Sequence, residues 1–372
     1  MKQTGEKRGK QHTFVKDLFC VMCVILAAGA VAMTLIVFVR QQKNLKTTRK
    51  ATVTESMPEN AASNNRDATV AQDVSAQNAD VREIHSLGDF GEEKWNEGRV
   101  LYQGKQDQYK SGLQNYLFLG IDNDDAVAPA QDGISGGQSD AMFLVVTDRN
   151  KQEINVIAIN RNTMVPVDVY DREGNYLMRM DLQICLQHGY GDGMKLSCLR
   201  SVEAVNRLFT GIPISGYLSL NMGGLAAVND AIGGVEITPL ESIKRGDIVI
   251  SKGKPVNLNG EQAYAYLRTR DVNAFGSAND RLARQQQYIT AVMDKLLADP
   301  GKANKVYEAG ADYIVASIDL PKLVNDAKDM TFTEKNMYSL PGTTEFKDEY
   351  EQYHVDEDGV IQLILNIFYE EL

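Results

Sequence analysis

The chain has 372 residues, of which 24% are charged, and its formal net charge is -11 at pH 7. This length suits one or two average domains. The acidic balance excludes a nucleic-acid partner, because neutralising backbone phosphates requires a basic face.

Residues 18–39 form an uncharged apolar run near the N-terminus. As a helix this run would be about 33 Å long, enough to cross a hydrocarbon core of about 30 Å. A cleaved signal peptide is the alternative, since Ala30, Val31 and Ala32 resemble a cleavage site, but the run continues beyond a typical signal core. We therefore predict an uncleaved transmembrane helix at 18–39.

Basic residues flank this run on both sides, so the positive-inside rule does not decide the orientation. Long C-terminal domains translocate with little regard to flanking charge. We predict a single-pass protein of the cell membrane, with residues 1–17 in the cytoplasm and the C-terminal domain outside it.

Residues 40–110 are predicted to be a stalk and lead-in. As far as residue 80 they are rich in Thr, Ala, Asn, Ser and Gln without an apolar period, which is typical of a flexible linker. From residue 83 to 113 a weak apolar pattern around Trp95 and Val100 indicates helical structure.

Three short apolar runs, at 115–121, 141–147 and 154–159, begin the folded part and predict strands buried on both faces. Later segments predict the helices that cover such a sheet and two further strands. The helices are expected at 197–209, 222–232, 261–267, 281–297 and 359–369, and the strands at 235–238 and 337–340. We expect residues 111–372 to form one α/β domain, a three-layer α-β-α arrangement with a central mixed sheet.

Two aspartates lie at strand ends. Asp122 follows the first predicted strand and Asp140 precedes the second. If these strands are antiparallel neighbours, both carboxylates reach one edge of the sheet, where they would suit Mg²⁺. The alternative is that they accept hydrogen bonds from turn amides.

Arg161 ends the third predicted strand, where open α/β sheets place ligands. After the helix at 261–267, an extended backbone would direct Arg268 and Arg270 to one side. Guanidinium groups that converge in this way suit a pyrophosphate.

On the next predicted helix, Arg281 and Gln285 share a face with Arg284 beside them, which a solvated helix face would also explain. Asp271 and Asp280 are the only carboxylates between Arg268 and Arg284, so we expect these arginines to lack acidic partners.

Cys185 and Cys198 lie in the part predicted to be exported, where a disulfide between them could persist. His188 has neither a Gly-x-Ser-x-Gly elbow nor a zinc motif beside it, so we interpret it as a structural loop residue.

Several motifs together resemble the LytR-CpsA-Psr family over residues 115–298. They are Gly-Ile-Asp at 120–122, Gly-Gly-Gln-Ser-Asp at 136–140, Ile-Asn-Arg-Asn-Thr at 159–163, Gly-Gly-Val-Glu-Ile at 233–237, Leu-Asn-Gly-Glu-Gln-Ala-Tyr-Ala-Tyr-Leu-Arg-Thr-Arg at 258–270 and Asp-Arg-Leu-Ala-Arg-Gln-Gln at 280–286. The resemblance implies a membrane-anchored phosphotransferase of mainly Gram-positive bacteria. It would move a glycopolymer, of the teichoic acid or capsular polysaccharide type, from an undecaprenyl pyrophosphate carrier onto peptidoglycan.

The resemblance also implies roles for individual residues. Asp122 and Asp140 would bind Mg²⁺. The pyrophosphate would be bound by Arg161, Arg268, Arg270 and Arg281, with Gln285 as a further phosphate contact and with Arg284 and Asn162 as additional substrate-binding candidates.

The family usually has Arg-Asp-Thr where this chain has Arg161, Asn162 and Thr163. An amide cannot accept a proton as a carboxylate does, so a role as base at Asn162 is open. A non-catalytic envelope protein that binds lipid-linked polymer or peptidoglycan is therefore the alternative function. The apolar residues Val202, Val205 and Leu225 would line a groove for the lipid tail or pack in the core.

Overall fold

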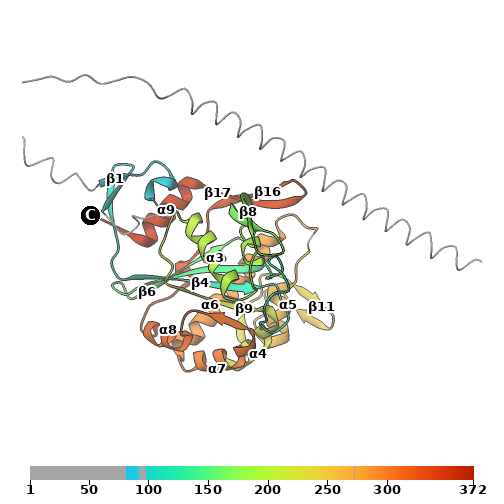
Figure 1. Cartoon of the computed structure of the whole chain (residues 1–372). Helices are drawn as coiled ribbons and strands as arrows, with labels where there is room; N and C mark the ends of the chain where they lie inside the picture. The colour runs from blue at the N-terminus through green and yellow to red at the C-terminus, as the bar shows by residue number, and fades with distance from the viewer. Residues whose placement is uncertain (1–80, 92–97, 272) are drawn as a thin grey trace, which may run out of the picture. The chain divides into compact units, whose positions relative to one another are not determined.

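The computed structural model describes residues 81–91, 98–271 and 273–372 (Figure 1). The predicted cytoplasmic tail at 1–17, the transmembrane helix at 18–39 and the stalk as far as residue 80 lie outside these ranges. Within the described ranges, no helix has both the length and the apolar character needed to span a bilayer.

A six-stranded mixed sheet forms the centre of the folded unit, with the strand order β14-β9-β4-β5-β6-β15. The pairs β4-β5, β5-β6 and β14-β9 are antiparallel, whereas β9-β4 and β6-β15 are parallel. The strands are β4 (Leu113–Ile121), β5 (Ser139–Asp148), β6 (Glu153–Ile159), β9 (Gly216–Asn221), β14 (Ile314–Ala316) and β15 (Met337–Ser339). The first three predicted strands are thus confirmed as neighbours.

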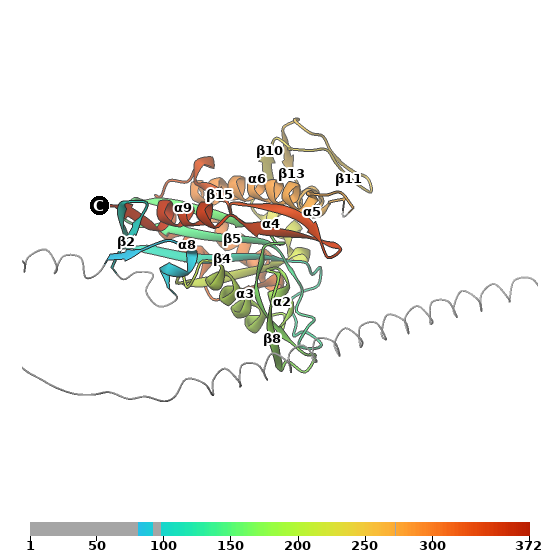
Figure 2. The ribbon, with the colours of Figure 1, turned by 90° about the horizontal axis from the view of Figure 1, so that it is seen from above.

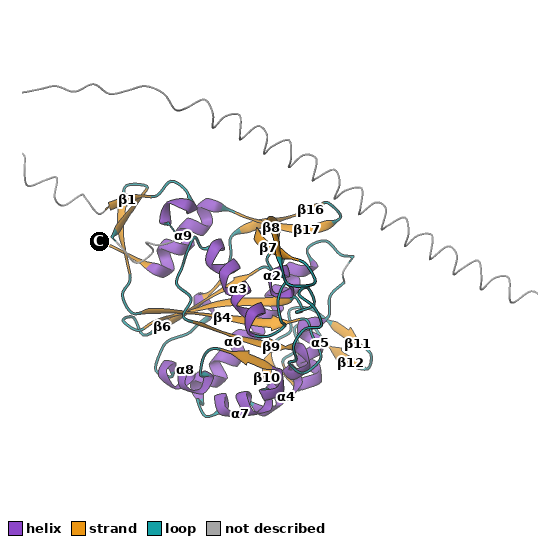
Figure 3. Ribbon diagram, viewed as in Figure 1, coloured by secondary structure: helices purple, strands orange, loops and turns teal. Residues whose placement is uncertain are grey.

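Each face of the sheet packs against its own set of helices (Figure 3). Strand side chains alternate, so Leu117, Leu119 and Ile121 of β4 face α3 (Lys195–Leu208) and α9 (Glu357–Phe368). Phe118 and Phe143 point to the opposite face. That face is covered by α4 (Leu225–Ala231), α5 (Gly260–Arg268), α6 (Ser277–Ala298), α7 (Lys302–Ala309) and α8 (Leu320–Ala327). The predicted central mixed sheet between helices is confirmed.

The described part of the lead-in is mainly β-strand, with one short 3-10 helix, η1 (Leu87–Phe90), which corrects the expectation of helical structure for residues 83–113. Its strands β1 (Val81–Glu83), β2 (Arg99–Tyr102) and β3 (Lys105–Tyr109) join the C-terminal strand β18 (Tyr369–Glu371) in a second sheet of four strands. Gln103 and Gly104 both have positive φ, 48° and 81°. This is the geometry of a two-residue hairpin turn, which glycine favours, and it joins β2 to β3.

Four two-stranded antiparallel sheets complete the unit. They are β7 (Met164–Tyr170) with β8 (Tyr176–Gln183), β10 (Val235–Ile237) with β13 (Val256–Leu258), β11 (Ile243–Arg245) with β12 (Ile248–Ile250), and β16 (Gly342–Lys347) with β17 (Tyr350–Val355). The short helical turns are α2 (Leu186–Gly189), η2 (Met222–Gly224), η3 (Ala311–Tyr313) and η4 (Glu334–Asn336). In Figure 2 the β11 and β12 strands project from the body of the unit beside α5.

Candidate anion-binding site

The two strand-end aspartates lie at one edge of the central sheet. Ile121 pairs with Ser139 across the antiparallel strands, and the backbone N–H of Asp122 donates to the carbonyl of Gln138 at 2.8 Å. This confirms that Asp122 and Asp140 share an edge.

Asp140 bridges two arginines from distant parts of the sequence. One carboxylate oxygen lies 2.7 Å from Nε of Arg161, and the other lies 2.6 Å from Nη1 of Arg281. The side chains of Arg161, Asp140 and Arg281 are 11%, 13% and 5% exposed, so both ion pairs are largely withdrawn from water. Charges paired in such surroundings are screened much less than surface pairs.

Arg268 forms the corresponding pair with Asp122. It is the last residue of α5, and one of its guanidinium nitrogens contacts Oδ1 of Asp122. The expectation that these arginines lack acidic partners is therefore wrong. The partners lie 146 and 141 residues away in sequence, beyond the reach of an argument from local spacing.

The cluster nevertheless carries more positive than negative charge. Burial lowers the pKa of Arg281, and the nearby charges of Arg270 and Arg161 lower it further, while Asp140 opposes them. Nη2 of Arg281 is buried and has no hydrogen-bond partner among the described residues. Like charges held together with an unused buried donor are the features expected of an anion-binding site.

A tight turn after β6 presents Arg161. The side-chain oxygen of Asn160 accepts the N–H of Asn162 at 2.8 Å, and the Asn160 carbonyl accepts the Thr163 hydroxyl at 2.7 Å. Such a turn, in which an Asn side chain bonds the backbone two residues on, explains the use of Asn and Thr on either side of the arginine.

Asn162 is buried and connects Arg161 to the C-terminal hairpin. Its oxygen accepts from Nη1 of Arg161 at 3.3 Å and from Gln183 at 3.0 Å. Its amide nitrogen donates to Glu351 of β17 at 3.2 Å, and the other Glu351 oxygen accepts the N–H of Gly276 at 2.6 Å. Glu351 therefore ties the hairpin to the Arg161 turn and to the start of α6. Local sequence gives no sign of this role, because Glu351 lies 189 residues from Asn162 along the chain.

Arg284 is buried, and its side chain bonds to groups of the protein itself. Its side chain is 2% exposed, and it donates to the carbonyls of Tyr266 and Thr269 while its Nε lies 2.6 Å from Glu241. These bonds hold the segment that carries Arg268 and Arg270, so the geometry gives Arg284 a positioning role. Arg281 and Arg284 are both buried, so the alternative of a solvated helix face is wrong.

Gln285 lies between this charged cluster and a large apolar cavity. Its amide nitrogen is 3.4 Å from the carbonyl of Asp140, and its side chain lines a cavity of about 200 Å³. Gly120, Ala141, Leu225 and Val292 are among the other residues that line it.

A second apolar cavity of about 140 Å³ adjoins the first. The two share Phe118, Phe143, Ile289, Val292, Leu296 and Leu320. Val202 and Val205, which we considered for the lipid groove, pack on the other face of the sheet. For these two residues the core-packing alternative is correct, whereas Leu225 lines the first cavity.

The two described cysteines are free, so the considered disulfide is not formed. Both are buried, which raises the pKa of each thiol to about 11. His188 is buried as well, and its Nδ1 lies 3.0 Å from the carbonyls of Gly136 and Gly137. These contacts fix the glycine loop before Asp140, in agreement with a structural role for His188.

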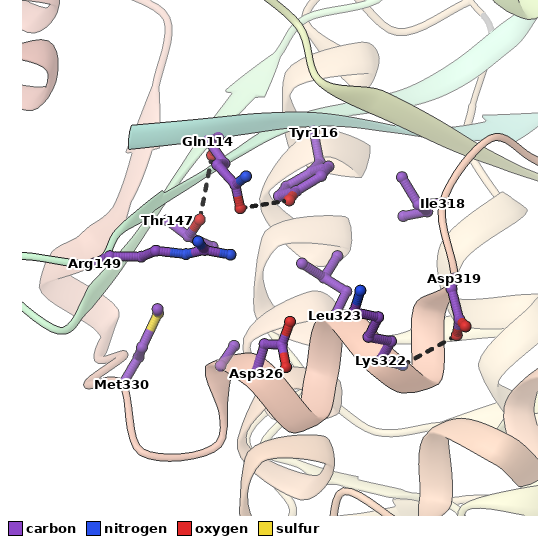
Figure 4. Close-up of a pocket in the computed structure, with 11 residues that line it drawn as sticks. Gln114, Tyr116, Thr147, Arg149, Ile318, Asp319, Lys322, Leu323, Asp326 and Met330 are labelled. Atoms are coloured by element: carbon purple, nitrogen blue, oxygen red, sulfur yellow. Dashed lines mark hydrogen bonds between the residues drawn. The ribbon is translucent and has the colours of Figure 1, made fainter. Parts of the chain in front are cut away.

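A separate pocket of about 260 Å³ lies toward the other end of β4 and β5 (Figure 4). It is lined by Gln114, Tyr116, Arg149, Lys322 and Asp326, among others, and the Tyr116 hydroxyl donates to Gln114 at 2.9 Å. None of the predicted site residues lines this pocket.

Two comparisons with known sequences agree with this architecture. Residues 91–366 match the sequence model of the LytR_cpsA_psr family. A protein of Enterococcus faecalis named polyisoprenyl-teichoic acid--peptidoglycan teichoic acid transferase TagU is 26% identical over 253 residues, which is 66% of this chain and 76% of that protein. The TagV transferase of Bacillus subtilis is 26% identical over 210 residues. That match covers 54% of this chain and 49% of the TagV protein.

Solved structures share the fold. The crystal structure of Bacillus subtilis TagV superposes with a TM-score of 0.54 at 22% identity, covering 69% of this chain and 96% of that one. A structure described as TagT bound to LI-WTA gives a TM-score of 0.51 at 20% identity, and the match covers 69% of this chain and 91% of that one.

Proposed function

Because this chain belongs to the LytR-CpsA-Psr family, we propose that it is a membrane-anchored phosphotransferase that attaches a glycopolymer to peptidoglycan. The donor would be a polymer of the teichoic acid or capsular polysaccharide type on an undecaprenyl pyrophosphate carrier. The names of its relatives, which are teichoic acid transferases acting on peptidoglycan, support this assignment.

The observation that carries the proposal is the convergence of arginines from separate segments around Asp140 and Asp122. Arg161, Arg268, Arg270 and Arg281 bring four positive charges to two carboxylates. The surplus suits a pyrophosphate, and guanidinium groups bind phosphate oxygens through paired hydrogen bonds.

We propose that Asp122 and Asp140 also hold Mg²⁺ when the donor is bound. In the described residues, no group of three or more His, Cys, Asp or Glu side chains is placed to bind a metal alone. Two carboxylates with phosphate oxygens are nevertheless a donor set that Mg²⁺ accepts. Asp122 bonds Arg268, and Asp140 bonds both Arg161 and Arg281, so the arginines would turn from the aspartates to the phosphates. The ion would neutralise charge on the phosphate oxygens.

The apolar cavity below Gln285 is the proposed place for the start of the polyprenyl tail. Its walls are almost wholly hydrocarbon, and it begins next to Asp140, the residue that joins Arg161 to Arg281. Burial of an apolar chain there would be favourable by about 25 cal/mol for each Å² removed from water. The membrane anchor at 18–39 would keep the domain close to the bilayer that supplies this lipid.

In the proposed transfer, a peptidoglycan hydroxyl attacks the phosphorus next to the sugar. A new P–O bond forms, the bridging P–O bond breaks, and the lipid leaves as a monophosphate whose freed oxygen takes up the proton that the hydroxyl loses. The arginines bind the phosphate oxygens and stabilise the charge that develops on the leaving group. Asn162 orients Arg161 in this scheme and takes no proton.

The test is turnover of a synthetic pyrophosphate lipid carrying a short saccharide, with peptidoglycan fragments as acceptor. Arg268→Ala and Arg281→Ala are expected to reduce transfer by about 10²-fold or more. Arg268 is 29% exposed, so its variant should keep the unfolding temperature of the native protein even if the more buried Arg281 variant does not. Undiminished transfer in both variants would disprove the proposal.

The alternative of a binding protein without catalysis retains one observation in its favour, the amide at position 162. It predicts saturable binding of the lipid without release of lipid phosphate. Measuring both quantities in the same assay distinguishes the two functions.

A further inference from the structure

The β11–β12 hairpin is strongly basic on a chain that is acidic as a whole. Between residues 243 and 254 it carries Lys244, Arg245, Lys252 and Lys254 against Asp247, and all four basic residues are exposed. A concentrated positive surface of this kind attracts an anionic partner.

The hairpin is fixed to α5 by its apolar side. Ile243 and Ile250 pair across the two strands and are buried in the same core cluster as Tyr266 of α5. Strand alternation places their neighbours Lys244 and Val249, also a cross-strand pair, on the outer side. The projecting strands seen in Figure 2 therefore display their charge to solvent.

A single aromatic ring connects the hairpin to the pyrophosphate site. The guanidinium carbon of Arg245 lies 4.6 Å from the centre of the Tyr264 ring, and that of Arg268 lies 6.0 Å from the same centre. The Tyr264 hydroxyl donates to Asp124 at 2.8 Å, which holds the ring beside both arginines. The basic hairpin thus adjoins Arg268 through Tyr264, with Asp122 and Asp124 as the acids at this junction.

We propose that this hairpin is a binding subsite for the anionic repeat units of the donor polymer, those that follow the pyrophosphate and bear phosphate or carboxylate groups. The inference rests on the proposed function and adds a preference for charged over neutral polymers. Arg245 contacts the units nearest the pyrophosphate, and Lys244, Lys252 and Lys254 contact those farther along.

A polymer fits this surface better than a lipid bilayer does. Large apolar side chains that insert into a bilayer are sparse here, since Val249 and Leu240 are the exposed ones in residues 239–255. Peripheral membrane elements combine basic residues with a broad apolar face. The basic surface also extends inward to Arg268, along the course that a polymer attached to the pyrophosphate would follow.

The experiment compares two synthetic donors with the same lipid, pyrophosphate and first saccharide. One ends in neutral sugars, and the other continues in glycerol phosphate units. The native protein is expected to bind the anionic donor about tenfold more tightly, corresponding to about 1.4 kcal/mol. The triple variant Lys244→Gln, Lys252→Gln, Lys254→Gln should lose this preference and still bind the neutral donor as the native protein does, because it leaves Arg245, Tyr264 and Arg268 intact.

The matched control is Lys322→Gln with Lys328→Gln, which removes exposed positive charge from α8 and its C-terminal end. It should keep the tenfold preference. Equal affinity of the native protein for both donors, or an equal loss on both in the triple variant, would overturn the subsite. So would loss of binding to anionic phospholipid vesicles as the only effect of the triple variant. If neither donor binds in an Arg268-dependent way, the proposed function has failed instead.

Discussion

Asp140 is the residue on which the charged cluster depends, since it accepts from both Arg161 and Arg281. If it also holds Mg²⁺, the ion should strengthen binding of inorganic pyrophosphate to the native protein. In Asp140→Asn this dependence on Mg²⁺ should vanish, because a neutral amide is a poor ligand for the ion. Calorimetric titration with and without a chelator checks this. If Mg²⁺ does not change the affinity of the native protein for pyrophosphate, the proposal that the two aspartates bind the ion is wrong, and their partners are the arginines alone.

Asn162 is the residue at which this chain departs from the family pattern, and Glu351 explains why an aspartate would be unfavourable here. In Asn162→Asp a second carboxylate would lie about 3 Å from that of Glu351. We expect a loss of about 1–3 kcal/mol in the free energy of unfolding at pH 7.

The loss should shrink at pH 4, because protonation of one carboxylate removes the repulsion and restores a donor. Adding Glu351→Gln to the variant should also restore stability at pH 7. Urea unfolding of the two single variants and the double variant gives the coupling energy. Additive effects would show that the two positions do not interact.

His188 should make stability depend on pH. Burial lowers its pKa below the ordinary value of about 6.5, so the folded protein holds this ring neutral where the unfolded chain takes up a proton. Above the pKa of the unfolded chain, His188 does not lower the free energy of unfolding. As pH falls from that pKa to the lower pKa of the folded protein, the protonation of the unfolded chain makes the free energy of unfolding progressively smaller. Unfolding free energies at pH 7.5 and 5.5 should differ less in His188→Gln than in the native protein. An unchanged difference would mean that other groups cause it.

At the scale of elements, local pattern was sufficient for the three central strands and for α6, whose periodicity reflects burial against a sheet. It failed for residues 99–109, because two short strands around Gln103 and Gly104 leave too few apolar positions to distinguish a hairpin from a helix. It also failed to identify ion-pair partners. Motifs in the sequence pointed to Arg161, Arg268 and Arg281, but no local signal reveals that Asp140 joins two of them or that Glu351 supports Asn162.

The junction between α5 and α6 gives a prediction at this scale. Arg284 holds the carbonyls of Tyr266 and Thr269 at the end of α5. Arg284→Met keeps much of the side-chain volume but leaves both carbonyls without this donor, which should cost about 1–3 kcal/mol for each buried group left unpaired. Pyrophosphate affinity should fall as well, since Arg268 and Arg270 lie on this segment. A variant that is less stable but binds normally would confine Arg284 to stability.

In the whole folded unit, the apolar face of α6 does not pack completely against the sheet. Ile289, Val292 and Leu296 line both apolar cavities and remain partly buried, although a helix of this pattern would ordinarily bury them fully. Protein interiors are close-packed, so an apolar space of this size is maintained at a cost in stability. A lipid tail that enters the space would recover that cost on binding.

A larger side chain in the cavity tests whether the lipid tail binds there. Val292→Phe adds an aromatic ring to the space that both cavities share, so it should maintain or raise the free energy of unfolding while binding of a long-chain pyrophosphate lipid falls at least tenfold. Binding of inorganic pyrophosphate should be unchanged, because the arginine cluster is not altered. Val292→Ala is the matched control, and it should lose about 1 kcal/mol of stability but retain the lipid. If Val292→Phe binds the long-chain lipid as well as the native protein does, the tail lies elsewhere and the cavity needs another explanation.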